Sequence, residues 1–228
     1  MDVFEAMKQR RSVRTYSDRP IEGEVLAALM AEIDACNAEG GLHIQLVLDE
    51  PEAFGTGIFK YGQFKGVRNY LCFVGPDNDE LDEKVGYYGE RVILRAQQLG
   101  LGTCWVALTF NKRRTRYELA PGEKLALVAS IGYGTAPSKP RKSKSLGDVS
   151  NAPGDAPDWF EQGVAAALLA PTAINQQKFR FEYLPPEGDG KPRVRATTRR
   201  GTQTRVDLGI AKCHFELAAG KENFDWAV

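Results

Sequence analysis

Residues 10–14, with the sequence Arg-Arg-Ser-Val-Arg, are the first group in the chain that could bind an anion. Arginine carries a planar, permanently charged guanidinium whose geometry matches a phosphate group. Apolar spacing predicts a helix just before this cluster, and the C-terminal end of a helix carries partial negative charge. Side chains, and not the helix dipole, would therefore have to bind a phosphate here. A solvated basic helix end is the alternative explanation for the same residues.

Residues 170–181 form a second unusual stretch, with the sequence Ala-Pro-Thr-Ala-Ile-Asn-Gln-Gln-Lys-Phe-Arg-Phe. Small and hydroxyl residues are followed by three amide side chains and then by an aromatic strand pattern. Such a turn is rich in hydrogen-bonding groups that could face a ligand. A purely structural helix end and turn, capped by Asn175, is the alternative explanation.

The composition narrows the function classes. The 228 residues include 30 basic and 30 acidic side chains, and this zero net charge argues against general binding to nucleic acid or to a membrane. Neither a membrane-spanning apolar run nor a signal-peptide pattern is present in the sequence, and two histidines are too few for a convincing zinc site. The cysteines form no CxxC pair, so we expect free, mostly buried thiols in a reducing cytoplasm. They are Cys36, Cys72, Cys104 and Cys213.

The elements that must position the two stretches follow from the spacing of apolar residues. Helices are predicted over residues 3–10, 26–39, 85–99, 112–119, 158–168 and 206–217. Strands are predicted over residues 42–48, 69–75, 103–109, 125–132, 178–184 and 193–198, and a loop over 53–65.

The order helix, strand, strand, helix occurs twice, at about residues 22–99 and 158–219, which indicates a weak internal repeat. We therefore predict an N-terminal half at 1–134, a basic, proline-rich linker or wrapping arm at 135–157, and a C-terminal half at 158–228. The halves would form one structural unit of the α+β class.

With these motifs the chain resembles the FMN-dependent nitroreductases. The family's Arg-Arg-Ser-x-Arg motif matches residues 10–14, and its Gly-Leu-Gly-x-x-Trp segment matches residues 100–105. Its Ala-Pro-Ser-x-x-Asn-Gln-Gln-Pro-Trp-x-Phe motif matches residues 170–181, with Thr172 in place of serine and Lys178-Phe179 in place of Pro-Trp. Its Gly-Tyr strand end and trailing basic segment match residues 132–133 and 139–144.

The order of the motifs resembles one branch of that family. Most members carry the Asn-Gln-Gln motif within a few dozen residues of the first motif, whereas here it lies in the second half. The resemblance thus implies a nitroreductase-like fold, an antiparallel-containing sheet with packed helices, and an internal pseudo-dimer of two helix-strand-strand-helix halves. It implies a monomer of this kind, or a homodimer of such chains.

The resemblance also implies a flavin site. Arg10 and Ser12 would bind the phosphate of FMN, Arg14 would reach the ribityl chain and pyrimidine edge, and Lys142 and Lys144 would close on the phosphate. No catalytic side chain and no metal is implied, because the flavin carries the chemistry. The implied cofactor-binding residues are Arg10, Arg11, Ser12, Arg14, Trp105, Val106, Ala107, Lys142, Lys144, Pro171, Thr172, Ala173 and Asn175.

The implied activity is hydride transfer from NADH or NADPH through FMN to a small electron-poor acceptor, such as a nitroaromatic compound or a quinone. We expect a cytoplasmic enzyme that binds neither nucleic acid nor membrane. A flavin-binding protein without turnover, for storage or sensing, remains the alternative, because Ala107 and Leu108 replace glycines of the family. A nucleic-acid binder that uses residues 10–14 and 139–144 would lack the usual basic net charge.

Overall fold

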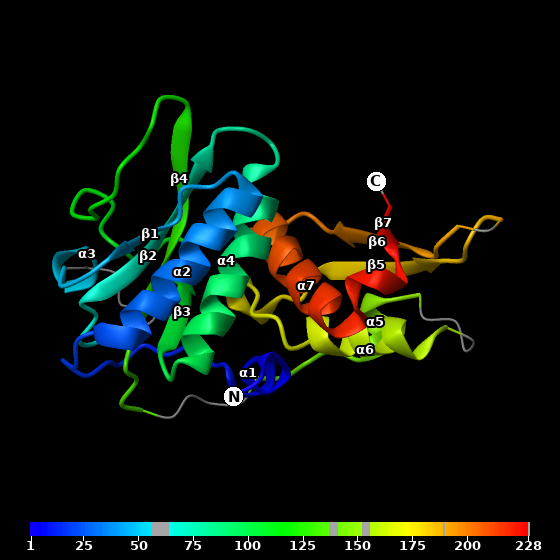
Figure 1. The fold of residues 1–228 in the computed structure, drawn as a ribbon, viewed down its shortest axis with the longest axis horizontal. Helices are drawn as coiled ribbons and strands as arrows, with labels where there is room; N and C mark the ends of the chain where they lie inside the picture. The colour runs from blue at the N-terminus through cyan, green and yellow to red at the C-terminus, as the bar shows by residue number, and fades with distance from the viewer. Residues whose placement is uncertain (56–63, 137–140, 152–155, 189, 228) are drawn as a thin grey trace. The chain divides into compact units, whose positions relative to one another are not determined.

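The computed structural model describes residues 1–55, 64–136, 141–151, 156–188 and 190–227. Its contacts divide the chain into two compact units. Unit 1 comprises Met1–Leu81 and Tyr88–Pro140, and unit 2 comprises Asp82–Tyr87 and Arg141–Val228. Helix α4 (Leu81–Gln98) therefore contributes residues to both units. Figure 1 shows the elements of each unit, and the units are described separately below.

Unit 1 is built on a four-stranded antiparallel sheet. The strands lie in the order β1 (Gln45–Val47), β2 (Asn69–Pro76), β4 (Glu123–Gly132), β3 (Gly102–Val106). Every β2 residue from Tyr70 to Gly75 is buried, which explains why the sequence of this strand is continuously apolar. Helix α2 (Gly23–Gly40) lies beside α4 on one side of the sheet (Figure 1).

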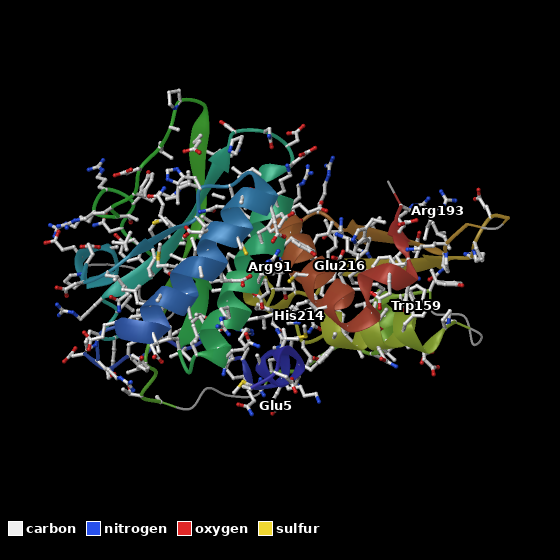
Figure 2. The ribbon with its side chains drawn as sticks, in the orientation of Figure 1. Glu5, Arg91, Trp159, Arg193, His214 and Glu216 are labelled. Carbon is white, nitrogen blue, oxygen red and sulfur yellow. The ribbon has the colours of Figure 1, made fainter. Side chains whose placement is uncertain are left out.

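An ion pair to α2 and close packing on an aromatic pair of the sheet fix α4 within unit 1. Arg91, labelled in Figure 2, lies 3.1 Å from Glu32 of α2. Phe73 of β2 stacks on Trp105 of β3 with ring centroids 4.4 Å apart. A Cβ atom at Gly89 of α4 would lie 2.6 Å from the Trp105 ring, so this helix position requires glycine.

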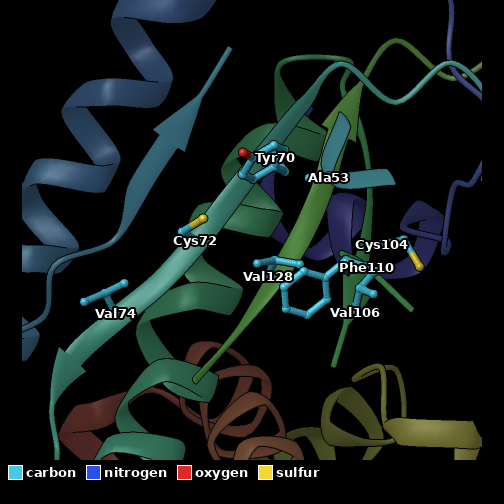
Figure 3. Close-up of a cluster of buried hydrophobic side chains, with 8 residues drawn as sticks. All are labelled: Ala53, Tyr70, Cys72, Val74, Cys104, Val106, Phe110 and Val128. Atoms are coloured by element: carbon cyan, nitrogen blue, oxygen red, sulfur yellow. The ribbon is translucent and has the colours of Figure 1, made fainter. Parts of the chain in front are cut away.

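The opposite face of the sheet carries a compact hydrophobic cluster (Figure 3). Alternate residues of β2 contribute to it, together with residues of β3, β4, the one-turn helix α3 (Glu52–Gly55) and the chain after β3. Because helices cover one face of the sheet and this cluster covers the other, the sheet forms the interior of unit 1. The cluster consists of Ala53, Tyr70, Cys72, Val74, Cys104, Val106, Phe110 and Val128.

The predicted helix at 112–119 is wrong, because this segment is irregular. Its backbone groups find partners outside the segment. The Arg116 amide donates to the Tyr70 hydroxyl at 2.8 Å, and the Glu118 amide donates to Gln45 Oε1 at 2.8 Å. Gln45 Nε2 in turn donates to the Glu118 carbonyl at 2.8 Å. Since side chains of the sheet satisfy this backbone, it needs no helix.

Other differences from the sequence-based expectation are local. The predicted loop at 53–65 begins with α3, and its residues 56–63 lie outside the described part of the chain. The strand predicted at 42–48 is shorter in the structure, where β1 covers only Gln45–Val47. Leu42 and Ile44 are buried but precede the residues that pair with β2, and Leu48 is exposed after them. The predicted arm at 135–157 contains the one-turn helix α5 (Leu146–Val149), and its residues 137–140 and 152–155 lie outside the described residues.

Unit 2 packs two helices and a small sheet. Helices α6 (Asp158–Ala167) and α7 (Thr204–Ala219) contact each other closely. Strands β5 (Phe179–Leu184) and β6 (Arg193–Thr198) pair antiparallel, and β7 (Asp225–Trp226) pairs parallel with β6. Two 3₁₀ turns, η1 (Ala173–Asn175) and η2 (Lys221–Asn223), complete the unit.

Aromatic side chains fill the core of unit 2. Phe215 of α7 stacks on Phe181 of β5 with ring centroids 4.7 Å apart, and Trp159 of α6 stacks on Phe224 at 5.5 Å. The Trp226 indole donates to Glu216 Oε2 at 2.8 Å, which fixes β7 against α7. Figure 2 labels Trp159 on α6 and Glu216 on α7. The sequence did not predict β7, because two residues are too few to show an alternating pattern.

The predicted α+β class with antiparallel strands is confirmed. The order helix, strand, strand, helix recurs as α2, β1, β2, α4 and as α6, β5, β6, α7, interrupted by the single turns α3 and η1. The pseudo-dimer relation between the halves stays a prediction. All four cysteines are free and buried, as predicted. Among the described residues, no helix is both long and apolar enough to cross a membrane, and no cluster of potential metal ligands occurs.

Candidate functional site

The 10–14 motif follows helix α1 (Val3–Gln9) and runs along the outer edge of β3 in unit 1. Ser12 forms a parallel bridge with Thr103, and the Val13 amide donates to the Thr103 carbonyl at 2.9 Å. Glycine at 102 permits this approach, because a Cβ atom there would lie 2.6 Å from the Val13 side chain. The structure thus brings the arginine motif beside the strand that carries Trp105 and Val106.

Arg10 is buried, with 4% of its surface exposed. Its Nε lies 3.8 Å from Glu90 Oε1, and its Nε and Nη1 atoms have no hydrogen-bond partner among the described residues. Burial lowers the pKa of Arg10, and the Glu90 carboxylate opposes that effect. Glu90 Oε2 also accepts from the Trp105 indole at 2.8 Å, so Arg10 and Trp105 are positioned by one buried carboxylate.

The other polar residues of the motif have different environments. Arg11 Nη1 donates to the carbonyls of Lys8 at 2.5 Å and Arg10 at 2.8 Å, and thereby caps the end of α1 as the alternative explanation requires. Arg14 is exposed and contacts the Ser12 carbonyl at 3.4 Å. The Ser12 side chain hydrogen-bonds to Cys104, a thiol whose pKa is raised by burial.

The chain leaves the sheet one residue after Trp105, whereas the sequence predicts a strand as far as residue 109. Val106 is the last residue of β3 and is buried, Ala107 is half-buried, and Leu108 is 70% exposed. Ala107 and Leu108 therefore lie just after the end of β3, the strand beside the arginine motif.

In unit 2, residues 172–177 form a strained loop, called here the 172–177 loop. Its φ angles are +48° at Ile174, +55° at Asn175 and +44° at Gln177, in a region that L-amino acids rarely adopt. Ile174 is 91% exposed although it is apolar and β-branched. Backbone strain of this kind persists only where the surrounding contacts impose it, and it is concentrated at functional sites.

Asp207 of α7 supplies one set of those contacts. Its Oδ1 accepts from the Ala173 amide at 2.9 Å, and its Oδ2 accepts from Gln176 Nε2 at 2.7 Å. Asp207 is buried, and burial raises its pKa to about 6 in spite of both hydrogen bonds. Thr172 Oγ1 adds a further contact by accepting from the Gln177 amide at 3.1 Å.

The basic segment at 141–144 supplies a second set of contacts to the 172–177 loop. Asn175 Nδ2 donates to the Lys142 carbonyl at 2.8 Å, and Lys144 Nζ donates to the Gln177 carbonyl at 2.5 Å. The Lys144 amide donates to Gln177 Oε1 at 2.9 Å, which leaves Gln177 Nε2 buried without a partner among the described residues. Unit 2 thus brings Lys142 and Lys144 together with Thr172, Ala173 and Asn175, and Pro171 is buried just before them.

Sequence reasoning missed four polar residues of these arrangements. Gln176 and Gln177 belong to the Asn-Gln-Gln motif, which could have identified them. Glu90 and Asp207 are two of several acids within helices, and nothing in the spacing of their neighbours distinguishes them from solvated side chains. Their importance appears only when burial and partners are known.

Comparison with solved structures gives several likenesses in fold. A putative nitroreductase from Thermotoga maritima superposes with a TM-score of 0.61 at 20% identity, covering 96% of this chain and 83% of that one. A nitroreductase family protein from Streptococcus pneumoniae gives 0.51 at 11% identity, covering 65% and 98%. A nitroreductase with bound FMN from Bacteroides fragilis gives 0.48 at 18% identity, covering 64% and 96%.

Comparison with curated proteins finds no match. The likeness to the T. maritima structure shows the α+β nitroreductase fold. The family described as "Putative TM nitroreductase" matches residues 2–219, which is nearly the whole chain. The chain belongs to this nitroreductase family.

Proposed function

We propose that the protein is an FMN-dependent oxidoreductase that transfers hydride from NADH or NADPH to a small electron-poor acceptor, such as a nitroaromatic compound or a quinone. Its membership of a nitroreductase family supports an oxidoreductase. The observation that carries the proposal is Arg10, which lies within the family motif and has two buried N–H groups without a hydrogen-bond partner among the described residues.

The donor set fits an anionic, hydrogen-bonding cofactor. Leaving a buried donor unpaired costs about 1–3 kcal/mol, more for a charged group, so a ligand that supplies acceptors is the natural explanation for Arg10. Gln177 Nε2 is a second buried donor of this kind, on the 172–177 loop. Guanidinium, hydroxyl and amide donors are the groups that a phosphate and a flavin edge accept from.

We assign the phosphate of FMN to Arg10 and Ser12, and the pyrimidine edge of the flavin to Arg14. Thr172, Ala173 and Asn175 would contact the flavin, and Lys142 and Lys144 would add positive charge. When bound, FMN supplies the hydride-accepting N5 atom. The protein's contribution is to bind and orient: Glu90 holds Arg10 and Trp105 in place, and Asp207 holds the 172–177 loop in its strained conformation.

The remaining assigned residues shape the binding region. Arg11 fixes the end of α1, and Trp105, Val106 and Ala107 form the strand end beside the motif. Arg14 would favour the reduced state, because a fixed positive charge stabilises negative charge that develops near it. Side-chain proton transfer has no part in this proposal.

The flavin content of the purified protein tests the proposal. We expect a yellow protein that releases FMN, and anaerobic addition of NADH or NADPH should bleach its visible absorbance. A colourless protein that takes up no added FMN would contradict the proposal. A protein that binds FMN but is reduced by neither nicotinamide would instead be the non-catalytic flavin-binding protein that Ala107 and Leu108 leave open.

A further inference from the structure

Unit 2 contains a hollow of about 570 Å³ that none of the assigned FMN-binding residues lines. Its walls are formed by the end of β6 and the start of α7. We call it the arginine hollow, because Arg199, Arg200 and Arg205 line it together with Gly201, Thr204 and Asp82. Three arginines against one aspartate give this lining a net charge of +2, in a chain whose net charge is zero.

These three arginines differ from their neighbours in having no ion-pair partner in the described part of the chain. Arg193, labelled in Figure 2, pairs with Glu187 at 2.6 Å, and Arg195 pairs with Glu182 at 3.3 Å. Arg199, Arg200 and Arg205 are exposed, and none of them forms an ion pair with a carboxylate of the described residues. Their charge is therefore available to an anionic ligand.

The start of α7 adds to the positive potential. Its N-cap residue, Gln203, makes no side-chain capping hydrogen bond, and the first-turn acid Asp207 directs its carboxylate to Ala173 and Gln176. The N-terminal end of a 16-residue helix carries a partial positive charge, which favours an anion in the same hollow as the three arginines.

Two hydrogen bonds connect the backbone of the hollow to the segment proposed to contact the flavin. Gln176 Nε2 donates to the Thr202 carbonyl at 2.8 Å, and Lys178 Nζ donates to the Arg200 carbonyl at 3.1 Å. A nicotinamide donor that reaches a flavin beside the 172–177 loop would pass close to this hollow. NADPH differs from NADH by a 2′-phosphate, an anionic group with the oxygen acceptors that arginine binds well.

We propose that the arginine hollow binds the 2′-phosphate of NADPH and makes NADPH the preferred hydride donor. This inference rests on the proposed oxidoreductase function. It names the substrate class within that function, and it assigns binding roles to Arg199, Arg200 and Arg205.

Anaerobic reduction kinetics of the FMN-loaded full chain test the donor preference. The Kd for NADPH should be lower than that for NADH by about tenfold or more, since at least one charge-assisted hydrogen bond distinguishes the donors. Arg199→Ala, Arg200→Ala and Arg205→Ala should each raise the Kd for NADPH by about tenfold and leave that for NADH unchanged. Added salt should reduce the preference, because the arginines are exposed.

Arg195→Ala is the matched control, because Arg195 is an exposed arginine of β6 that pairs with Glu182 outside the hollow. It should change neither Kd. Arg200→Lys retains a positive charge and should keep part of the preference for NADPH over NADH. In Arg200→Ala and in Arg200→Lys, the backbone carbonyl at position 200 can still accept the hydrogen bond from Lys178. Equal affinity for both donors, or variants that weaken both equally, would overturn the inference.

Calorimetric titration with 2′-phospho-ADP-ribose and with ADP-ribose separates this inference from the proposed function, since neither probe can transfer hydride. Preferential binding of the phosphorylated probe, lost in the three alanine variants, supports the arginine hollow even if no nicotinamide reduces the flavin. Equal binding of both probes by a protein that NADPH and NADH do reduce would overturn the hollow and leave the oxidoreductase proposal intact.

Discussion

Asp207 is a buried acid that hydrogen-bonds to the strained 172–177 loop. Its titration can be measured through the stability of the protein. Burial raises its pKa from the ordinary 3.8 to about 6, so the native state binds a proton more tightly than the unfolded chain does. The contribution of Asp207 to the free energy of unfolding therefore falls as pH rises between these values. A shift of about two units corresponds to at most about 3 kcal/mol. Asp207→Asn should remove this slope, and urea unfolding at pH 4, 5, 6 and 7.5 measures it.

The control for this prediction is Asp158→Asn, which removes an exposed acid from the first turn of α6 and so separates the loss of a charge from the loss of a buried charge. A constant stability difference between wild type and Asp207→Asn over the whole range would show that Asp207 has no raised pKa. The Asp207→Asn variant should also weaken FMN binding, because an asparagine side chain has a single acceptor oxygen and could not hold both Ala173 and Gln176 in the same way.

Arg14 offers a prediction about redox potential. If its charge lies near the pyrimidine edge, Arg14→Ala should make bound FMN harder to reduce, with a potential lower by on the order of tens of millivolts. Arg14→Lys keeps a positive charge and should stay close to wild type. A redox titration of both reconstituted variants measures the shift. Equal potentials in wild type and Arg14→Ala would contradict the assignment of Arg14.

Site residues that belong to a local motif could be predicted from the sequence. Site residues whose role depends on burial and on long-range contacts could not. The resemblance of local motifs to the nitroreductase family implied Thr172, Asn175 and Lys144, and the structure places them together in unit 2. Asp207 accepts a hydrogen bond from Gln176, which lies 31 residues earlier in the chain. The spacing of residues along the sequence does not indicate such a long-range contact. The same reason applies to Glu90, which is 15 residues from Trp105.

At the level of elements, α7 is held to the sheet of unit 2 by aromatic packing. Phe215 is fully buried and contacts the rings of Phe160, Phe181 and Phe224. Phe215→Ala should lower the free energy of unfolding by about 3–5 kcal/mol, because it leaves a large cavity among rings that cannot all collapse into it. Urea unfolding at pH 7.5 measures the loss.

Leu217→Ala provides the matched control on the same helix, since Leu217 is 37% exposed. It should cost less than about 1.5 kcal/mol, because its side chain is already partly in water. Similar losses in the two variants would mean that the aromatic cluster does not stabilise unit 2 in the way its ring contacts indicate.

Long elements were predictable because their apolar periodicity is strong. Helices α2, α4, α6 and α7 and strands β2, β4, β5 and β6 lie where the pattern predicts them, to within a few residues. The segment 112–119 has helix-compatible composition, yet contacts with Tyr70 and Gln45 determine its conformation. Tertiary contacts overrode local propensity there.

For the whole molecule, the sequence predicts one flavin per chain. The Arg-Arg-Ser motif and the Asn-Gln-Gln motif each occur once, in opposite halves of the chain. Titration of the FMN-free protein with FMN should reach its end point at one equivalent, and native mass spectrometry should show one FMN per chain. Two equivalents per chain would contradict the argument that the halves form a pseudo-dimer with a single site.

The arrangement of the sheet in unit 1 has a consequence for association between chains. Its two outermost strands are β1 and β3, and unpaired outer strands invite edge-to-edge aggregation. At the β1 edge, the side-chain amide of Gln45 hydrogen-bonds to the backbone N–H and carbonyl of Glu118. At the β3 edge, Ser12 forms a β-bridge with Thr103. The residues that carry the proposed phosphate motif therefore also shield a sheet edge. A chain that lost its first 14 residues would lose the proposed phosphate-binding residues and gain a surface on which another strand could add.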